Sequence, residues 1–212
     1  MPAAVSHLLT RQSYRGPKVP AVKVLEDVTF ERGRAHEICG NARRTMAFAV
    51  GQAMVGNILW IRPTWAPGRL NPEGFMRFVD PGRIIMATPK RPEDLLWCTE
   101  EALRAGVIPL VVADLPGPPG LTAVRRLHLA AETGAELSGS PPLGLLLTPD
   151  KGGAPGVESR WAMTPAHVDT KAEAWVLDRV RARTAPEKRF YIKGLKDGFA
   201  LTERPSSDAS AT

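Results

Sequence analysis

The stretch Arg34–Thr45, RAHEICGNARRT, combines a glycine, adjacent arginines and a hydroxyl residue with an apolar segment. Its pattern predicts a buried strand, a turn that opens at Gly40 and then a helix, which is the layout around a phosphate-binding loop of the form G-x-x-x-x-G-K-[ST]. In such a loop, backbone N–H groups surround the phosphates, a lysine reaches the outer phosphates and a hydroxyl holds magnesium. The sequence therefore predicts the position of a nucleotide site at Gly40, Arg43, Arg44 and Thr45.

This loop departs from the working form, because it is too short, lacks the second glycine and has arginine where lysine is required. Asp114, at the end of an apolar run, stands where an ATPase would hold magnesium, and Glu73 or Glu100 would then orient the attacking water. Without the glycine and lysine we favour plainer roles, in which Asp114 caps a turn and the glutamates face solvent. The site is predicted to be vestigial, with no cofactor and no turnover.

The two loop arginines leave one alternative open. Guanidinium groups pair with phosphate in two directions, so Arg43 and Arg44 still permit weak nucleotide binding. A divergent ATPase that uses Arg44, Thr45 and Asp114 with magnesium is therefore kept as the second hypothesis.

Length and composition favour one domain of ordinary core size, because the chain has 212 residues of which 43% are hydrophobic. The longest apolar runs, such as Val107–Ala113, fall short of the roughly 20 residues that span a bilayer. The N-terminus lacks the apolar core of a secretory signal. We expect a cytoplasmic protein with no membrane contact.

Cysteine and histidine give no metal-site pattern. Cys39 and Cys98 stand far apart, which fits buried thiols in a reducing compartment. The four histidines have no ligand spacing, so no metal is predicted.

Positive charge is concentrated at the two ends of the chain, although the formal net charge of +6 applies to the whole. Residues 1–45 carry 8 Lys/Arg against 4 Asp/Glu, residues 46–150 carry 9 against 10, and residues 151–212 carry 11 against 8. Such flanks attract phosphate backbones or acidic protein surfaces through a salt-dependent interaction. A solvated basic surface that only maintains solubility explains the composition equally well.

Strand and helix patterns alternate through the middle of the chain, which predicts an α/β fold with a mostly parallel sheet covered on both faces. The predicted strands are Ala35–Cys39, Ile58–Ile61, Arg83–Ala87, Pro109–Leu115 and Gly144–Leu147. The predicted helices are Thr45–Val55, Pro72–Val79 with Asn71 as its N-cap, Pro92–Ala105, and Thr122–Thr133 with Thr122 as its cap. Trp97, Trp161 and Trp175 are expected in the core.

The chain changes character after Pro149. Arg160–Met163 is predicted as a strand, and Trp175–Arg183 with Arg189–Leu195 as a C-terminal β-hairpin, although a helix over Ala172–Arg183 stays open. The predicted organisation is a flexible basic arm over 1–24, a core over 25–167, a basic β extension over 168–203 and a disordered tail over 204–212.

Several short segments, in this order, resemble the RecA/SulA-like superfamily, and within it the ImuA-type accessory proteins of bacterial inducible mutagenesis. The resemblance covers residues 25–165 and rests on Gly33 with Ala35–Ile38, Arg91–Asp94 with Glu100–Arg104, Val111–Leu115, Arg125–Glu132 and Gly144–Leu147. It implies a degenerate RecA-like three-layer core.

The resemblance also implies a function in the DNA-damage (SOS) response. ImuA-type proteins are thought to bind a polymerase-like hub and an error-prone DNA polymerase during translesion synthesis, and RecA is kept as a further partner. Contact with DNA is a hypothesis that rests on the basic flanks of the chain. Division inhibitors of the same superfamily have lost the phosphate loop and bind a tubulin-like protein. A division inhibitor is therefore a third hypothesis, beside the non-catalytic adaptor and the divergent ATPase.

Two groups of residues are predicted to contact a partner or DNA. The first consists of Trp65 and Arg69 in a proline-rich loop, and of Arg125 and Arg126 on a helix. The structural alternatives are that Trp65 covers the sheet edge and that one of the two helix arginines pairs with Glu132 or Asp114. The second group lies in the C-terminal hairpin and comprises Arg181, Arg183, Lys188 and Arg189.

Overall fold

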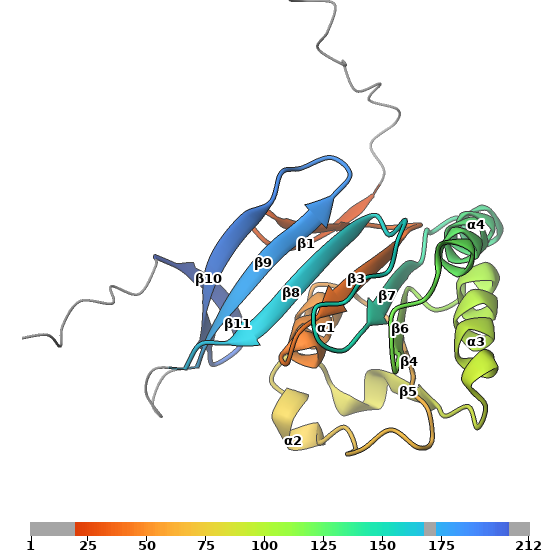
Figure 1. The fold of residues 1–212 in the computed structure, drawn as a ribbon. Helices are drawn as coiled ribbons and strands as arrows, with labels where there is room; N and C mark the ends of the chain where they lie inside the picture. Colours follow the sequence, from red (N-terminus) through yellow and green to blue (C-terminus); the bar gives the residue numbers. More distant parts are fainter. Residues whose placement is uncertain (1–19, 168–172, 204–212) are drawn as a thin grey trace, which may run out of the picture.

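The computed structural model describes residues 20–167 and 173–203, which form a nine-stranded mixed sheet with helices and a separate two-stranded hairpin (Figure 1). The hairpin consists of β1 (Ala21–Leu25) and β2 (Val28–Glu31). The large sheet contains β3 (Ala35–Cys39), β4 (Ile58–Ile61), β5 (Ile84–Ala87), β6 (Leu110–Asp114), β7 (Leu143–Leu147), β8 (Ser159–Pro165), β9 (Ala174–Ala182), β10 (Lys188–Leu195) and β11 (Gly198–Thr202). The helices are α1 (Arg43–Gln52), α2 (Pro72–Phe75), α3 (Pro92–Ala105) and α4 (Leu121–Ser138), with a 3₁₀ turn at Pro81–Arg83.

The order of strands in the large sheet is β11-β10-β9-β8-β3-β7-β6-β4-β5. The six strands from β8 to β5 are parallel, and β9, β10 and β11 continue the sheet in antiparallel fashion. The α/β class and the mostly parallel sheet are thus confirmed. The predicted C-terminal extension continues the same sheet.

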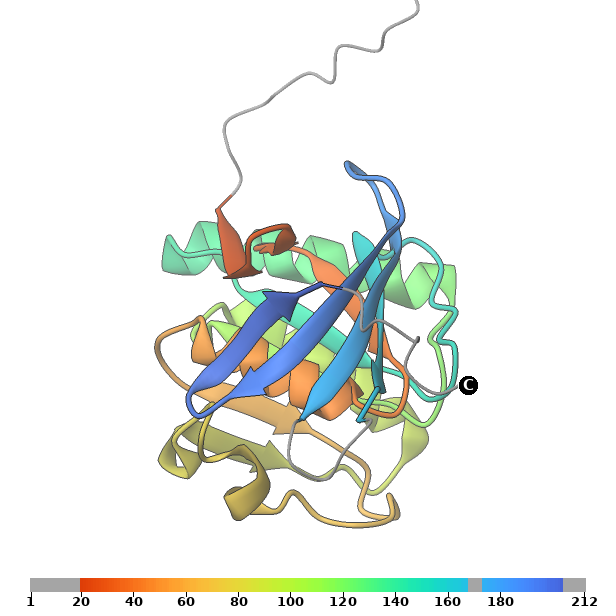
Figure 2. The same cartoon turned by 90° about the vertical axis from the view of Figure 1, so that its left-hand side faces the viewer.

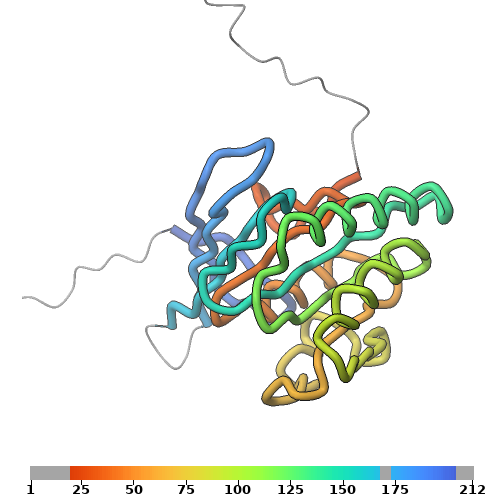
Figure 3. The backbone as a smooth tube through the Cα atoms, turned by 45° about the vertical axis from the view of Figure 1, so that its right-hand side comes forward, coloured from red at the N-terminus to blue at the C-terminus, as the bar shows by residue number. Residues whose placement is uncertain are grey.

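Helices cover both faces of the parallel part of the sheet (Figure 3). On one face, α1 and α2 pack with the β1–β2 hairpin around a large apolar cluster, whereas α3 and α4 enclose a second cluster on the other face. The three central strands β3, β7 and β6 are therefore buried at every residue. Because helices cover both faces of these strands, nearly all of their residues are apolar.

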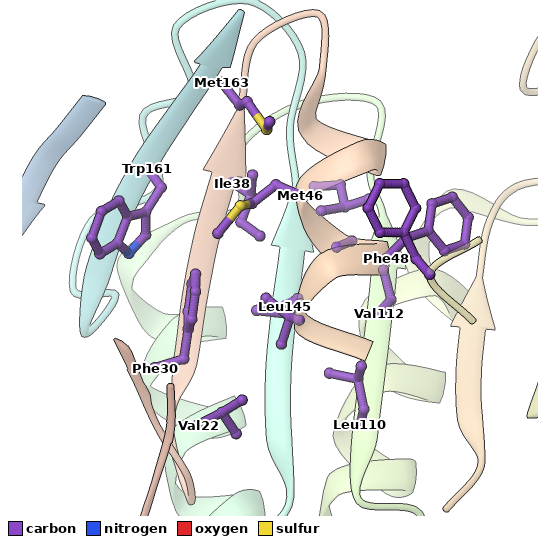
Figure 4. Packing of buried hydrophobic residues seen from close by; sticks show 14 of the residues in the cluster. Val22, Phe30, Ile38, Met46, Phe48, Leu110, Val112, Leu145, Trp161 and Met163 are labelled. Carbon is purple, nitrogen blue, oxygen red and sulfur yellow. The ribbon is translucent and has the colours of Figure 1, made fainter. Parts of the chain in front are cut away.

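Aromatic and aliphatic side chains fill the layer between the sheet and α1 (Figure 4). The ring of Phe48 from α1 stacks on Trp60 of β4 and on Phe75 of α2, with centroid distances of 4.8 and 4.4 Å. Such stacking fixes α1 against the sheet. The start of α1, where the predicted nucleotide site lies, is positioned by this packing.

The antiparallel strands curl around α1 and bring β11 back toward the polypeptide that follows α2 (Figure 2). The ring centroid of Phe199 in β11 lies 4.9 Å from the ring centroid of Trp175 and 5.1 Å from that of Phe78. Trp161 and Trp175 are buried, as predicted. The alternative of a helix over Ala172–Arg183 was wrong for the part that the structure describes, and β11 was missed.

The predicted helix boundaries were wrong at both ends of α4 and at the end of α2. The N-cap of α4 is Gly120, and no side chain, including that of Thr122, caps this end. The helix continues past Gly134 to Ser138, because Gly134 permits a close approach to the Leu103 carbonyl of α3 instead of ending the helix. Helix α2 has only four residues, although Asn71 accepts the predicted capping hydrogen bond from Glu73 N at 3.2 Å.

Trp97 was wrongly predicted to be in the core, since the side chain is 58% exposed. The buried face of α3 includes Leu95, Thr99 and Leu103. At about 100° per residue, Trp97 lies almost opposite Leu95 on the helix. It is an exposed aromatic side chain.

Part of the predicted N-terminal arm is ordered, because Ala21–Leu25 pairs with β2. The rest of the predicted arm and the predicted tail over 204–212 lie outside the described residues. Within the residues described, no helix has the length and hydropathy needed to cross a membrane.

Candidate functional site: a closed loop and an open sheet edge

The β3–α1 loop begins at Gly40, which adopts a left-handed φ of +86°. A Cβ atom at this position would lie 2.4 Å from the Met163 carbonyl oxygen of β8. Only glycine fits both the backbone conformation and the contact. The loop is therefore packed directly against the end of β8.

Backbone donors of this loop are used within the protein. Gly40 N donates to Asp150 O at 3.0 Å, Ala42 N to Met163 O at 3.0 Å, and Arg43 N to Gly40 O at 3.3 Å. A phosphate-binding loop instead directs successive N–H groups at the anion. These three N–H groups, which could otherwise bind a triphosphate, therefore donate to backbone carbonyls of the protein itself.

Asp114, at the end of β6, is buried and paired with the loop arginines. Arg44 Nε and Nη2 lie 2.8 and 2.7 Å from Asp114 Oδ2, and Arg43 Nε lies 4.0 Å from Oδ1. Both Arg44 nitrogens thus share a single carboxylate oxygen, and hydrogen bonds between two charged groups are stronger than those between neutral groups. The cation that would meet a phosphate and the carboxylate that would hold magnesium bind each other.

Four of the five predicted nucleotide-site residues, Gly40, Arg43, Arg44 and Asp114, are therefore brought together by the fold, at the carboxyl ends of the parallel strands β3 and β6 on either side of β7. Thr45 follows in α1 and is half-buried. The predicted role of Asp114 as a turn cap is replaced by the ion pair.

Glu37, in the middle of β3, is a site residue that sequence reasoning missed. Its buried carboxylate accepts hydrogen bonds from Thr148 Oγ1 at 2.7 Å and from the N–H groups of Gly153 and Ala154 at 2.9 and 3.0 Å, and pairs with Arg160. These bonds hold the loop after β7 beside Gly40. The available signal was a carboxylate in a segment predicted to be a buried strand, because a buried charge must be satisfied.

Cys39 follows Glu37 on the same strand and is a buried thiol, as predicted. Burial, with a contribution from the Glu37 charge, raises the pKa of the Cys39 thiol to about 11. The thiol stays protonated near neutral pH and is a poor nucleophile.

Glu100 was predicted to face solvent, which is wrong, because it is buried and bound by arginines of α3 and α4. Burial would raise the pKa of Glu100, but hydrogen bonds from Arg104 and Arg126 outweigh burial and lower it. Arg126 Nη2 lies 2.7 Å from Glu100 Oε2. Glu100 therefore joins two helices electrostatically.

The predicted pairing of a helix arginine with Glu132 or Asp114 was wrong, because Glu132 pairs with Arg34 and Asp114 with Arg44. The other helix arginine, Arg125, is exposed and lines a groove between α4 and the start of β3.

Much of the charge of the predicted basic hairpin is balanced locally. Arg189 binds Asp178 through two hydrogen bonds of 2.6 and 2.9 Å, and Lys188 pairs with Asp27. Arg183 lies 3.5 Å from Glu158, and Arg181 is exposed. This balance weakens the attraction of the hairpin for a phosphate backbone.

At the opposite end of the sheet, β5 is an edge strand. Among the described residues, its only strand neighbour is β4. Ile85 and Met86 are 42% and 44% exposed. An edge with unpaired backbone groups and apolar side chains is a template for pairing with another strand.

A cavity of about 490 Å³ lies beside this edge. Met86, Ile84, Leu70 and Phe75 supply apolar walls, and Arg69 contributes a charge. The loop that closes the cavity is held by Arg62, which donates to the carbonyls of residues 66 and 68 at 2.9 and 2.5 Å. Arg69 is thus placed beside the open edge.

Trp65 lies in this same loop and is 47% exposed, which leaves the alternative that it covers the sheet edge untested. Its predicted role in partner contact stays a prediction. Among the described residues, no cluster of histidine, cysteine and carboxylate side chains is suited to a metal ion.

A scan of protein-family models finds no match to this chain, and a search of curated proteins finds no significant match.

Proposed function

We propose that the protein is a non-catalytic, RecA-like adaptor of the bacterial DNA-damage response that supports translesion DNA synthesis by binding other proteins. The resemblance of residues 25–165 to ImuA-type proteins motivates this assignment. The mostly parallel sheet, with helices on both faces, is consistent with a RecA-like core.

The observation that carries the proposal is the closed β3–α1 loop. Its arginines bind Asp114, and its N–H groups donate to Asp150, Met163 and Gly40. Nucleotide binding would have to break the Arg44–Asp114 pair, and a buried carboxylate that loses its partner without replacement costs about 3 kcal/mol or more. This cost favours binding functions over ATP turnover.

The β5 edge offers the adaptor a protein-binding surface. An extended segment of a partner would pair with the β5 backbone and place an apolar side chain in the adjacent cavity, where Met86 and Phe75 form its walls. Strand addition of this type combines main-chain hydrogen bonds with pocket specificity. The proposed partners are the polymerase-like hub and the error-prone polymerase, with RecA as a further candidate.

Affinity capture from DNA-damaged bacteria tests this proposal. Tagged wild-type protein is expected to retain polymerase subunits identified by mass spectrometry. Met86→Lys should abolish their capture, because it places a charge at the apolar edge. Val107→Lys changes another exposed apolar side chain, outside the cavity, and should retain capture.

Two results would contradict the proposal. One is the recovery of a tubulin-like division protein in place of polymerase subunits, which would identify a division inhibitor. The other is equal capture by the wild-type and Met86→Lys proteins, which would remove the β5 edge from the binding surface. Thermal unfolding of each variant shows whether it is folded.

A further inference from the structure

A second groove, of about 420 Å³, lies between α4 and the polypeptide around Gly156 and Arg183. The groove is remote from the β5 edge. Arg34, which lines the groove, directly precedes β3, and three strands separate β3 from β5. Binding at this groove is therefore independent of the function proposed for the β5 edge.

One wall of the groove is a regular stripe along α4. Leu121, Arg125 and Leu129 follow one another at intervals of four residues and line the groove. Residues four apart share a helix face, so a guanidinium is flanked on both sides by exposed apolar side chains. Arginine is enriched among the residues that dominate protein-binding surfaces, and neighbouring exposed apolar side chains mark such surfaces.

The floor of the groove is fixed and uncharged. His128 Nδ1 accepts a hydrogen bond from Ala35 N at 3.4 Å, so Nε2 carries the proton and faces the Gly156 carbonyl oxygen at 3.1 Å. Burial, reinforced by the nearby charges of Arg34 and Arg183, lowers the pKa of His128, although the hydrogen bond to Gly156 opposes this. His128 therefore contributes shape to the groove and no charge near neutral pH.

The remaining charges of the groove are predominantly positive. Arg34 is engaged by Glu132 and lies 3.8 Å from Glu158. Arg183 shares the same Glu158 carboxylate at 3.5 Å and keeps 70% of its side chain exposed. Arg125 makes no ion pair with the residues that the structure describes.

We propose that this groove binds an acidic peptide segment of a partner protein. Carboxylates of the segment pair with Arg125 and Arg183, and an apolar side chain packs between Leu121 and Leu129. A nucleic-acid backbone fits less well, because Glu132 lies in the groove and the leucines offer nothing to a phosphate. Charge complementarity and apolar contacts together select an acidic, leucine-containing peptide.

Fluorescence anisotropy with the full chain tests the proposal. The probe is a short labelled peptide in which pairs of aspartates alternate with leucine. We expect saturable binding that Arg125→Glu weakens by about tenfold, the effect of losing one charge-assisted contact at the centre of a small interface. Lys90→Glu, a charge reversal at another exposed cation, should leave binding unchanged.

Two further probes separate charge from apolar contact. A peptide with serine in place of leucine should bind more weakly to the wild-type protein, and Leu129→Ser should reduce the affinity for the leucine peptide but not for the serine peptide. Arg125 and Leu129 are exposed, so these variants are expected to keep the wild-type melting temperature.

The proposal is overturned if Arg125→Glu and Lys90→Glu weaken peptide binding equally, or if the peptide does not bind. It is also overturned if a single-stranded oligonucleotide binds in an Arg125-dependent manner while the peptide does not, because the groove would then recognise nucleic acid.

Discussion

The Arg44–Asp114 ion pair engages two residues that the sequence pattern had assigned to a phosphate-binding loop and a magnesium site. Arginine in place of lysine already weakened the phosphate-loop interpretation, but the residue types alone left weak phosphate binding open. In the structure the guanidinium is bound by a carboxylate 70 residues away in sequence. The same residue types that would serve a nucleotide site neutralise each other.

His36 is expected to make stability depend on pH. Its Nδ1 lies 2.7 Å from Ser159 Oγ and its Nε2 lies 2.9 Å from Glu31 O. Complete burial lowers the pKa of His36 from 6.5 to about 4. Between pH 6.5 and pH 4, His36 is therefore protonated in the unfolded chain but neutral in the folded chain. The free energy of unfolding consequently falls by about 3 kcal/mol as the pH drops from 6.5 to 4.

Urea unfolding at several pH values checks this expectation against His36→Gln, which does not titrate. Other titrating groups are common to both proteins, so the difference between their free energies of unfolding isolates His36. The advantage of the wild-type protein should be constant above pH 7 and should shrink toward pH 4. If the difference between the two free energies of unfolding stayed the same at every pH, the pKa of His36 would not be lowered by folding.

At the scale of elements, α3 and α4 depend on a close contact between their last turns. The Gly134 backbone approaches α3 so closely that an added Cβ would lie 2.0 Å from Leu103 O and 3.1 Å from Gly106 Cα. Neither backbone atom can move aside cheaply. Gly134 therefore sets the spacing of the two helices over the sheet.

Gly134→Ala should lower the free energy of unfolding by about 2 kcal/mol in urea titrations, because overpacking outweighs the helix-propensity gain of about 1 kcal/mol. Gly74→Ala provides the matched control, since a Cβ at that helical glycine has no atom within 4 Å. Its stability should stay within about 0.5 kcal/mol of wild type or rise. Equal effects of the two substitutions would contradict the close-contact explanation.

The edge strand β5 and the α4 groove lie in different parts of the same sandwich of helices and sheet. One offers unpaired backbone groups beside an apolar cavity, and the other offers an arginine between two leucines. Their separation would allow the two proposed partners to bind at once, as the proposed adaptor function requires.

At the scale of the whole molecule, the sequence was informative about elements and less so about their contacts. Apolar runs such as Ile58–Ile61 and the proline-to-glycine pattern of Pro92–Ala105 located a strand and a helix to the residue. Local patterns of this type need no long-range information. They were sufficient for the α/β class.

Features that depend on distant contacts could not be predicted in the same way. The Gly40–Asp150 and Ala42–Met163 hydrogen bonds, which close the loop, join segments more than 100 residues apart. The continuation of the sheet through β9 to β11 likewise depends on pairing with β8 and not on a local signal. The closed state of the candidate site was therefore accessible only from the fold.

Calorimetric titration with ATP and magnesium tests most directly the proposal that the β3–α1 loop binds no nucleotide. We expect no saturable heat of binding at millimolar ATP, because Arg44 and Asp114 are bound to each other and the loop donors are used. Micromolar binding that is lost in Asp114→Ala would contradict the claim and favour a divergent ATPase.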